Sequence, residues 1–215
     1  MTVRRICLWA AAAALAGAAG TAAILRAQQA PAPPERAAAV LARWFPETPQ
    51  VYLQVRDAGA LLDRFRASPR RTQYEEGRNF EDFRKSRLYR KLELRIRDME
   101  QSAGFGITME NLRTFLGTET ALWLYDIGDL KFVAATRLPE ARFAASVLSG
   151  AAGRFEERTE DGLSYRVRVP QDGGPAILYA RVGDLLVFGT DPDRFLPVAV
   201  SLRKRPDFRA ASAEV

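Results

Sequence analysis

The sequence ETALWLYDIGDLKFVAATRL, residues 119–138, decides the fold, because it predicts two strands that are neighbours in a sheet. Its two halves, residues 119–127 and 130–138, combine apolar side chains with the aromatic and β-branched residues that strands favour. Between them stands Gly128-Asp129, a pair typical of the tight turn in a hairpin. The stretch therefore predicts a β-hairpin, and with it an antiparallel sheet.

Strand patterns continue on both sides of this hairpin. They are separated by turn-forming pairs such as Asp161-Gly162 and Gly183-Asp184. Strands and helices do not alternate regularly, so hairpins rather than parallel crossovers are expected to build the sheet. The further strands are predicted at residues 50–55, 154–160, 163–169, 176–182 and 184–190.

Helical patterns fill the remaining stretches. Asp57 and Thr108 are suited to cap helix N-termini, and Gly104 and Gly117 are suited to end helices. The polar residues 70–78 predict a loop. Helices are expected at residues 57–67, 79–102, 108–116 and 139–148, followed by one turn at 192–195 and a last helix from Pro197. The order of elements predicts an α+β domain, an antiparallel sheet with helices packed on one face.

The N-terminus carries Arg4 and Arg5 ahead of the uncharged, mostly apolar residues 6–25. Residues 1–25 fit a signal peptide, with small side chains placed for a cut after Ala23. They also fit a signal anchor, for which about 20 apolar residues suffice. Both alternatives stay open. In each, the arginines remain in the cytoplasm, and the domain lies outside it, in the periplasm or cell envelope, secreted or anchored by one N-terminal helix.

Residues 26–36 are rich in proline and alanine and predict an extended linker. A single α+β domain is expected over residues 37–215. The sequence stops where another strand could begin, so we expect either a longer natural domain or a frayed tail.

The single cysteine, Cys7, lies in the leader, so the domain is expected to depend on an ordinary hydrophobic core rather than on disulfides.

Several stretches carry a resemblance to known proteins. They are PETPQVYLQVRD at 46–57, FLGTETALWLYD at 115–126 and LPEARFAASVL at 138–148, behind a leader and a proline-rich spacer. Together they resemble an uncharacterised family of bacterial exported or membrane-anchored proteins, a domain of unknown function. The resemblance covers most of residues 46–202 and rests on strand and helix patterns. It implies an envelope location, without a known activity and without site residues.

The domain lacks the side chains that common catalytic sites use. The chain has no histidine, and its cysteine lies in the leader. Histidine triads, thiol catalysis and the usual zinc sites are therefore excluded. We predict a non-enzymatic domain without catalytic residues, metal or cofactor, and the alternative is an exported hydrolase that uses acidic residues. The acidic candidates are Glu75-Glu76, Glu156-Glu157, Glu160-Asp161 and Asp191 with Asp193.

Positive charge is concentrated in one stretch of the chain. The net charge is +6, and residues 84–97 contain seven basic residues and a single glutamate. In a continuous helix, four of these basic residues fall on one stripe, next to an apolar stripe that should pack on the sheet. The candidate anionic-partner face is Arg84, Arg87, Lys91 and Arg95, and the apolar stripe is Leu88, Leu92, Ile96 and Met99.

The basic stripe predicts an anionic membrane surface or an acidic envelope protein as the partner. One alternative is a solvated helix face whose charges are partly neutralised by salt bridges. Another is a structural subunit whose basic helix or sheet edge is buried in an envelope assembly. Nucleic acid is not expected, because the leader places the domain outside the cytoplasm, and the oligomeric state is left open. The pairs spaced for salt bridges are Glu81 with Lys85, Glu93 with Arg97, and Arg95 with Asp98.

Overall fold

The computed structural model describes residues 48–170 and 174–204. The predicted leader at residues 1–25 and the linker at 26–36 lie outside the described part of the chain. Within it, seven strands form one sheet in which each neighbouring pair is antiparallel, so the α+β class is confirmed. The strands are β1 (Val51–Asp57), β2 (Thr118–Asp126), β3 (Lys131–Arg137), β4 (Glu156–Glu160), β5 (Leu163–Arg168), β6 (Ile177–Val182) and β7 (Leu185–Gly189).

The predicted hairpin lies inside the sheet, whose strand order is β1-β2-β3-β7-β6-β5-β4. β2 and β3 pair with Trp123 opposite Val133, and β7 pairs with the other side of β3. The turn is longer than predicted: Asp126 pairs with Lys131, so residues 127–130 all lie between the strands. The hairpin is therefore confirmed, with a wider turn than Gly128-Asp129 alone would make.

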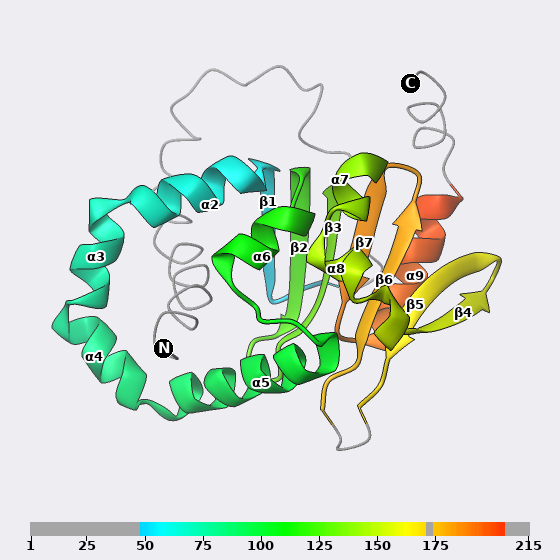
Figure 1. Ribbon diagram of the computed structural model, residues 1–215. Coiled ribbons are helices and arrows are strands. Elements are labelled where there is room, and N and C mark those ends of the chain that lie inside the picture. The colour runs from blue at the N-terminus through cyan, green and yellow to red at the C-terminus, as the bar shows by residue number, and fades with distance from the viewer. Residues whose placement is uncertain (1–47, 171–173, 205–215) are drawn as a thin grey trace.

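The helices surround the sheet, and α2 to α5 follow one another in an arc beside it (Figure 1). Among the described residues, no helix combines the length and the apolar character needed to cross a membrane. The helices are α2 (Ala58–Ala67), α3 (Pro69–Glu75), α4 (Arg78–Lys85), α5 (Arg87–Ala103), α6 (Met109–Phe115), α7 (Glu140–Ala144), α8 (Val147–Gly150) and α9 (Pro192–Arg203), with a 3₁₀ turn at Ala152–Arg154.

Two predicted helices are each divided at a serine. The helix expected at 79–102 becomes α4 and α5, because Ser86 has an extended backbone and its hydroxyl accepts a hydrogen bond from the Tyr89 N–H (3.1 Å). The helix expected at 139–148 becomes α7 and α8 at Ser146, whose hydroxyl also caps the second helix. A serine hydroxyl that caps a new helix competes with continuation of the old one, so helical periodicity alone did not predict these breaks.

Two prolines account for the other corrections. Of residues 70–78, predicted as a loop, residues 70–75 belong to α3, since Pro69 suits the first helical position, and Arg78 begins α4. The last helix does not start at Pro197 but runs through it. A proline inside a helix costs about 3 kcal/mol. Here the complete burial of neighbouring side chains, including Phe195 and Val198, offsets that cost.

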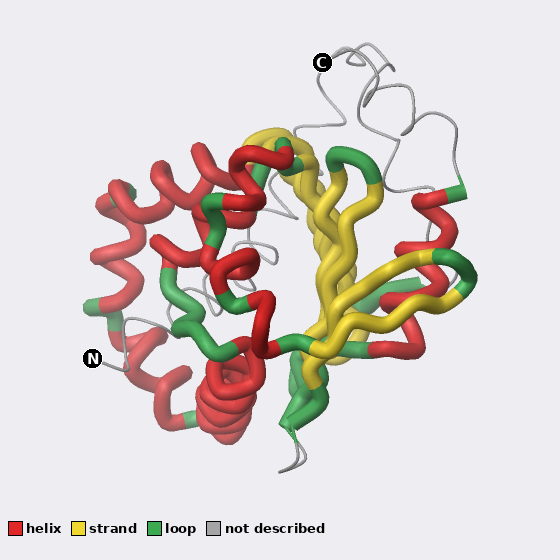
Figure 2. The backbone as a smooth tube through the Cα atoms, turned by 45° about the vertical axis from the view of Figure 1, so that its right-hand side comes forward, coloured by secondary structure: helices red, strands yellow, loops and turns green. Residues whose placement is uncertain are grey.

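Both faces of the sheet are covered. Phe195 and Val198 of α9 pack with Trp123 on one face, whereas α5, α6 and α8 cover Phe132 and Phe188 on the other. Figure 2 shows the sheet close to edge-on, with α9 on one side and the remaining helices on the other. The expected packing on one face holds for α5, α6 and α8, and α9 is the exception. The reason is that successive residues of the central strands are apolar toward both faces.

Candidate anionic-partner surface

α5 is attached to the sheet by one apolar side. Leu92, Ile96 and Met99 are at most 4% exposed and belong to the core cluster beneath the helix, as predicted. Leu88 was predicted in the same row but is 44% exposed, because Tyr89 fills the buried position in the first turn. The remaining sides of α5 carry the charged residues.

The predicted basic stripe is divided by the break at Ser86. Arg84 belongs to α4, whereas Arg87, Lys91 and Arg95 belong to α5. The extended backbone of Ser86 interrupts the i, i+3 spacing that would place Arg84 beside Arg87 in a continuous helix. The structure therefore keeps the four residues on consecutive helices but does not align them in one helical row.

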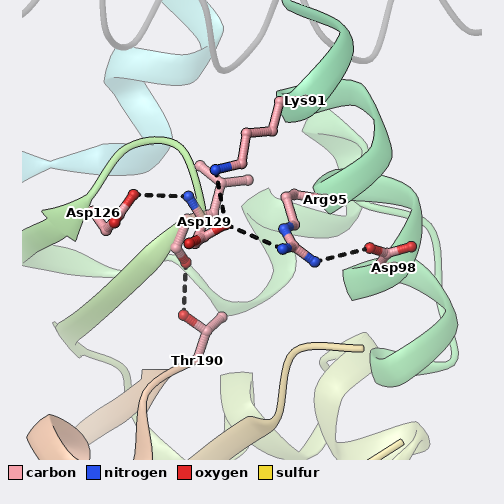
Figure 3. Close-up of polar contacts among 7 residues, drawn as sticks. Lys91, Arg95, Asp98, Asp126, Asp129 and Thr190 are labelled. Carbon is pink, nitrogen blue, oxygen red and sulfur yellow. Dashed lines mark hydrogen bonds and ion pairs between the residues drawn. The ribbon is translucent and has the colours of Figure 1, made fainter. Parts of the chain in front are cut away.

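Lys91 and Arg95 bind the same carboxylate in the β2–β3 turn. The Lys91 Nζ lies 3.0 Å and the Arg95 Nη2 3.1 Å from Oδ1 of Asp129 (Figure 3). Hydrogen bonds from Lys91 and then from Arg95 hold the pKa of the Asp129 carboxyl below its usual value. Asp129 is 37% exposed, so each pair contributes at most about 1 kcal/mol to stability. Two charges of the predicted face are thus partly neutralised.

The turn itself places Asp129 under α5. The Asp126 carboxylate accepts a hydrogen bond from the Asp129 N–H (2.8 Å; Figure 3). Thr190, directly after β7, donates to the Leu130 carbonyl (2.7 Å) and accepts from the Phe132 N–H (3.2 Å). The sequence analysis missed Asp129 as a partner of the helix, because 34 residues separate it from Arg95 and no local pattern links them.

The salt bridges predicted along the helices all form. Their N–O distances range from 2.8 to 3.5 Å, and most of the side chains involved remain in contact with water. Such exposed pairs add little stability, but they reduce the net field of the surface. The pairs are Glu81 with Lys85, Glu93 with Arg97, and Arg95 with Asp98.

Opposite the buried side, Arg87, Arg90, Leu94 and Arg97 form what we call the outer face of α5. All four side chains are exposed. Leu94, which lies between arginines along this face, is 56% exposed. Within the described residues, Arg84, Arg87 and Arg90 form no ion pair, whereas Arg97 does. The sequence analysis did not single out Arg90 or Leu94, although their i+3 and i+7 spacing from Arg87 predicts this face.

Four of the acidic residues considered for a hydrolase form ion pairs with arginines in the structure. Asp191 in addition caps α9, as the sequence predicts, by accepting a hydrogen bond from the Asp193 N–H (3.2 Å). In the part of the chain that the structure describes, no group of three or more acidic, histidine or cysteine side chains is placed to hold a metal ion. The contacts are Glu75 with Arg71 (2.6 Å), Glu156 with Arg158 (2.7 Å), Glu157 with Arg166 (2.9 Å) and Asp191 with Arg194 (2.7 Å).

Comparison of the chain with protein-family models, with curated proteins and with solved structures finds no match. The resemblance of residues 46–202 to exported bacterial proteins therefore stays a prediction. The function has to be inferred from the residues and their arrangement.

Proposed function

We propose that this protein is a non-enzymatic cell-envelope domain, exported or tethered by its N-terminus, that binds an anionic membrane surface. Contact is made through Arg84 and the outer face of α5. The observation that carries the proposal is that Arg84, Arg87 and Arg90 are exposed and form no ion pair within the described residues. The location outside the cytoplasm rests on the leader pattern of residues 1–25.

Leu94 favours a membrane over an acidic protein as the partner. It is 56% exposed, with Arg90 four residues before it and Arg97 three residues after it. Helices that lie in a membrane interface combine basic residues, which bind lipid headgroups, with apolar side chains that enter the acyl boundary. The outer face of α5 has both. An acidic envelope protein is the alternative partner.

The expected affinity of this surface is low. Each basic residue near an anionic bilayer contributes about 1 kcal/mol, so three unpaired arginines contribute about 3 kcal/mol. A dissociation constant of about 1 mM already requires about 4 kcal/mol. The arginines alone therefore give weak binding, which is measurable at low salt and high lipid concentration, and an anchor at residues 1–25 would strengthen it by raising the effective concentration.

Vesicle co-sedimentation tests the proposal. Residues 1–25 are removed for this experiment, since a leader could insert by itself. Binding to vesicles that contain anionic phosphatidylglycerol is compared with binding to neutral phosphatidylcholine vesicles. We expect binding only to the anionic vesicles, decreasing with salt. The combined Arg84→Gln, Arg87→Gln and Arg90→Gln variant should bind about 100-fold more weakly.

The matched control removes the same charge from neighbouring helices. Arg66, Arg70 and Arg78 are also exposed, and their combined replacement by glutamine should leave vesicle binding nearly unchanged. Equal losses in both triple variants would mean that net charge alone drives binding, and the proposed surface would be rejected. No binding of the unmodified domain to anionic vesicles would favour an acidic protein partner instead.

A further inference from the structure

A cavity of about 360 Å³ lies on β5 and β6, on the face of the sheet that α7 and α8 cover. This volume falls in the range of about 300–1,000 Å³ that is usual for small-molecule sites. No residue of α4 or α5 lines it, so it is separate from the proposed membrane surface. Its polar lining comes from four elements and includes Ser149, Glu157, Ser164, Arg166, Tyr179 and Arg181.

Two polar groups among the lining residues lack a hydrogen-bond partner. Tyr179 is 3% exposed, and within the described residues its buried hydroxyl has no hydrogen-bond partner. The Nε of Arg181, two residues further along β6, is also buried and without an acceptor there. Nearly all buried polar groups in proteins are paired, so two unpaired donors next to one cavity can pair with ligand atoms when the side chains that cover them shift.

The two arginines of the cavity are held in place by the backbone. Arg166 donates to the Ala152 carbonyl (3.1 Å). Arg181 donates to the Leu138 carbonyl (2.6 Å), and its guanidinium lies 5.1 Å from the ring centre of Phe143. Groups that are already oriented lose little conformational freedom when a ligand binds.

The charge of these arginines remains accessible to a ligand. Their acidic partners are Glu157 for Arg166 and Glu140 for Arg181, and these glutamates are 60% and 76% exposed. Such exposed pairs are weak, so a bound acid can replace a glutamate as the partner of a guanidinium. Burial raises the pKa of the Tyr179 hydroxyl, which therefore stays protonated at neutral pH and can donate a hydrogen bond.

We propose that this cavity binds a small organic oxyanion, a carboxylate or a phosphate ester with an apolar ring. The oxyanion is bound by Arg166, Arg181 and the hydroxyl of Tyr179, because guanidinium groups pair with either kind of anion. The ring packs against the aromatic rings of Phe143 and Tyr179, which lie 6.2 Å apart. Ser149 and Ser164 supply further hydroxyl groups to the same cavity.

Binding of defined probes to the full chain tests this proposal. The probes are benzoate, phenyl phosphate and inorganic phosphate, with benzamide as the neutral counterpart of benzoate. Ligand-observed NMR and the Tm shift are measured up to about 10 mM probe, which detects millimolar dissociation constants. We expect benzoate or phenyl phosphate to bind and benzamide not to bind. The stronger of the two identifies the anion, and weak binding of inorganic phosphate confirms the contribution of the ring.

Variants locate the binding in the cavity. Tyr179→Phe and Arg166→Gln should each weaken binding of the aromatic anion at least tenfold. Arg168→Gln removes the same charge from β5 at a residue that does not line the cavity, and should leave binding unchanged. The Tm of unliganded Tyr179→Phe should not fall, which shows that the variant folds. The proposal is overturned if no anion binds, if benzamide binds equally well, or if both cavity variants bind like the wild type.

Discussion

Thr136 carries a buried hydroxyl that joins β3 to the chain just before β2. It is fully buried, lies 2.6 Å from the Thr120 hydroxyl and accepts a hydrogen bond from the Gly117 N–H (2.8 Å). A Cβ at Gly117 would overlap the backbone carbonyl of Arg137, so only glycine lets the chain approach β3 this closely. Thr136 and Gly117 thus hold β3 against the start of β2, at the end of the hairpin opposite its turn.

We expect Thr136→Val to lower the free energy of unfolding by about 1–3 kcal/mol, because it keeps the volume but leaves the buried Gly117 N–H without its acceptor. Urea unfolding followed by circular dichroism measures the change. Thr159→Val, an exposed threonine on β4, is the matched control and should stay within about 0.5 kcal/mol of the wild type. Equal effects of the two substitutions would contradict the assigned role of the Thr136 hydroxyl.

Between elements, the contact of α5 with the β2–β3 turn limits the charge available on the helix. Asp129 neutralises part of Lys91 and Arg95, which the sequence had placed on the candidate partner face. We predict that Asp129→Asn strengthens binding to anionic vesicles several-fold, since it removes one negative charge beside two cations. Co-sedimentation measures this, with Asp161→Asn as a control in a distant turn. Unchanged or weaker binding of Asp129→Asn would argue against α5 as the membrane contact.

The same variant has a pH signature. The lowered pKa of Asp129 means that its pairs stabilise the protein above the usual carboxyl pKa of 3.8, and that this contribution is lost as the pH falls through the lower pKa of the folded state. At neutral pH, Asp129→Asn should therefore be less stable than the wild type by at most about 2 kcal/mol, about 1 kcal/mol for each of the two pairs. The difference should vanish in strong acid, as urea unfolding at several pH values would show.

For the whole molecule, the predicted leader at residues 1–25 bears on where the domain acts. We predict that the native protein is recovered outside the cytoplasm, and fractionation with a carbonate wash plus the intact mass tests this. A cut near Ala23 with soluble protein would identify a signal peptide, and the cavity on β5 and β6 would then be the first site to study. The full-length mass in the washed membrane would identify an anchor that holds α5 near a bilayer. Recovery in the cytoplasm would contradict the predicted location.

The sequence by itself determined the features that depend on neighbouring residues. The two strand-like runs within residues 119–138, joined by Gly128-Asp129, predicted the hairpin. Asp57 and Thr108 cap helices as expected, with their side chains accepting from Ala60 and Asn111. The salt bridges along α4 and α5 were predictable for the same reason, since i, i+3 and i+4 positions meet on any helix. The α+β class follows from the order of these local elements.

The tertiary structure alone decided which distant residues meet. β7 pairs with β3 across residues 138–184, α9 covers the opposite face, and Asp129 reaches Arg95 from 34 residues away. The cavity likewise needs α7, α8, β5 and β6 to come together before Arg166 and Tyr179 share one site. Such contacts depend on how both apolar faces of the sheet are buried, and no short pattern in the chain specifies the partner that will cover each face.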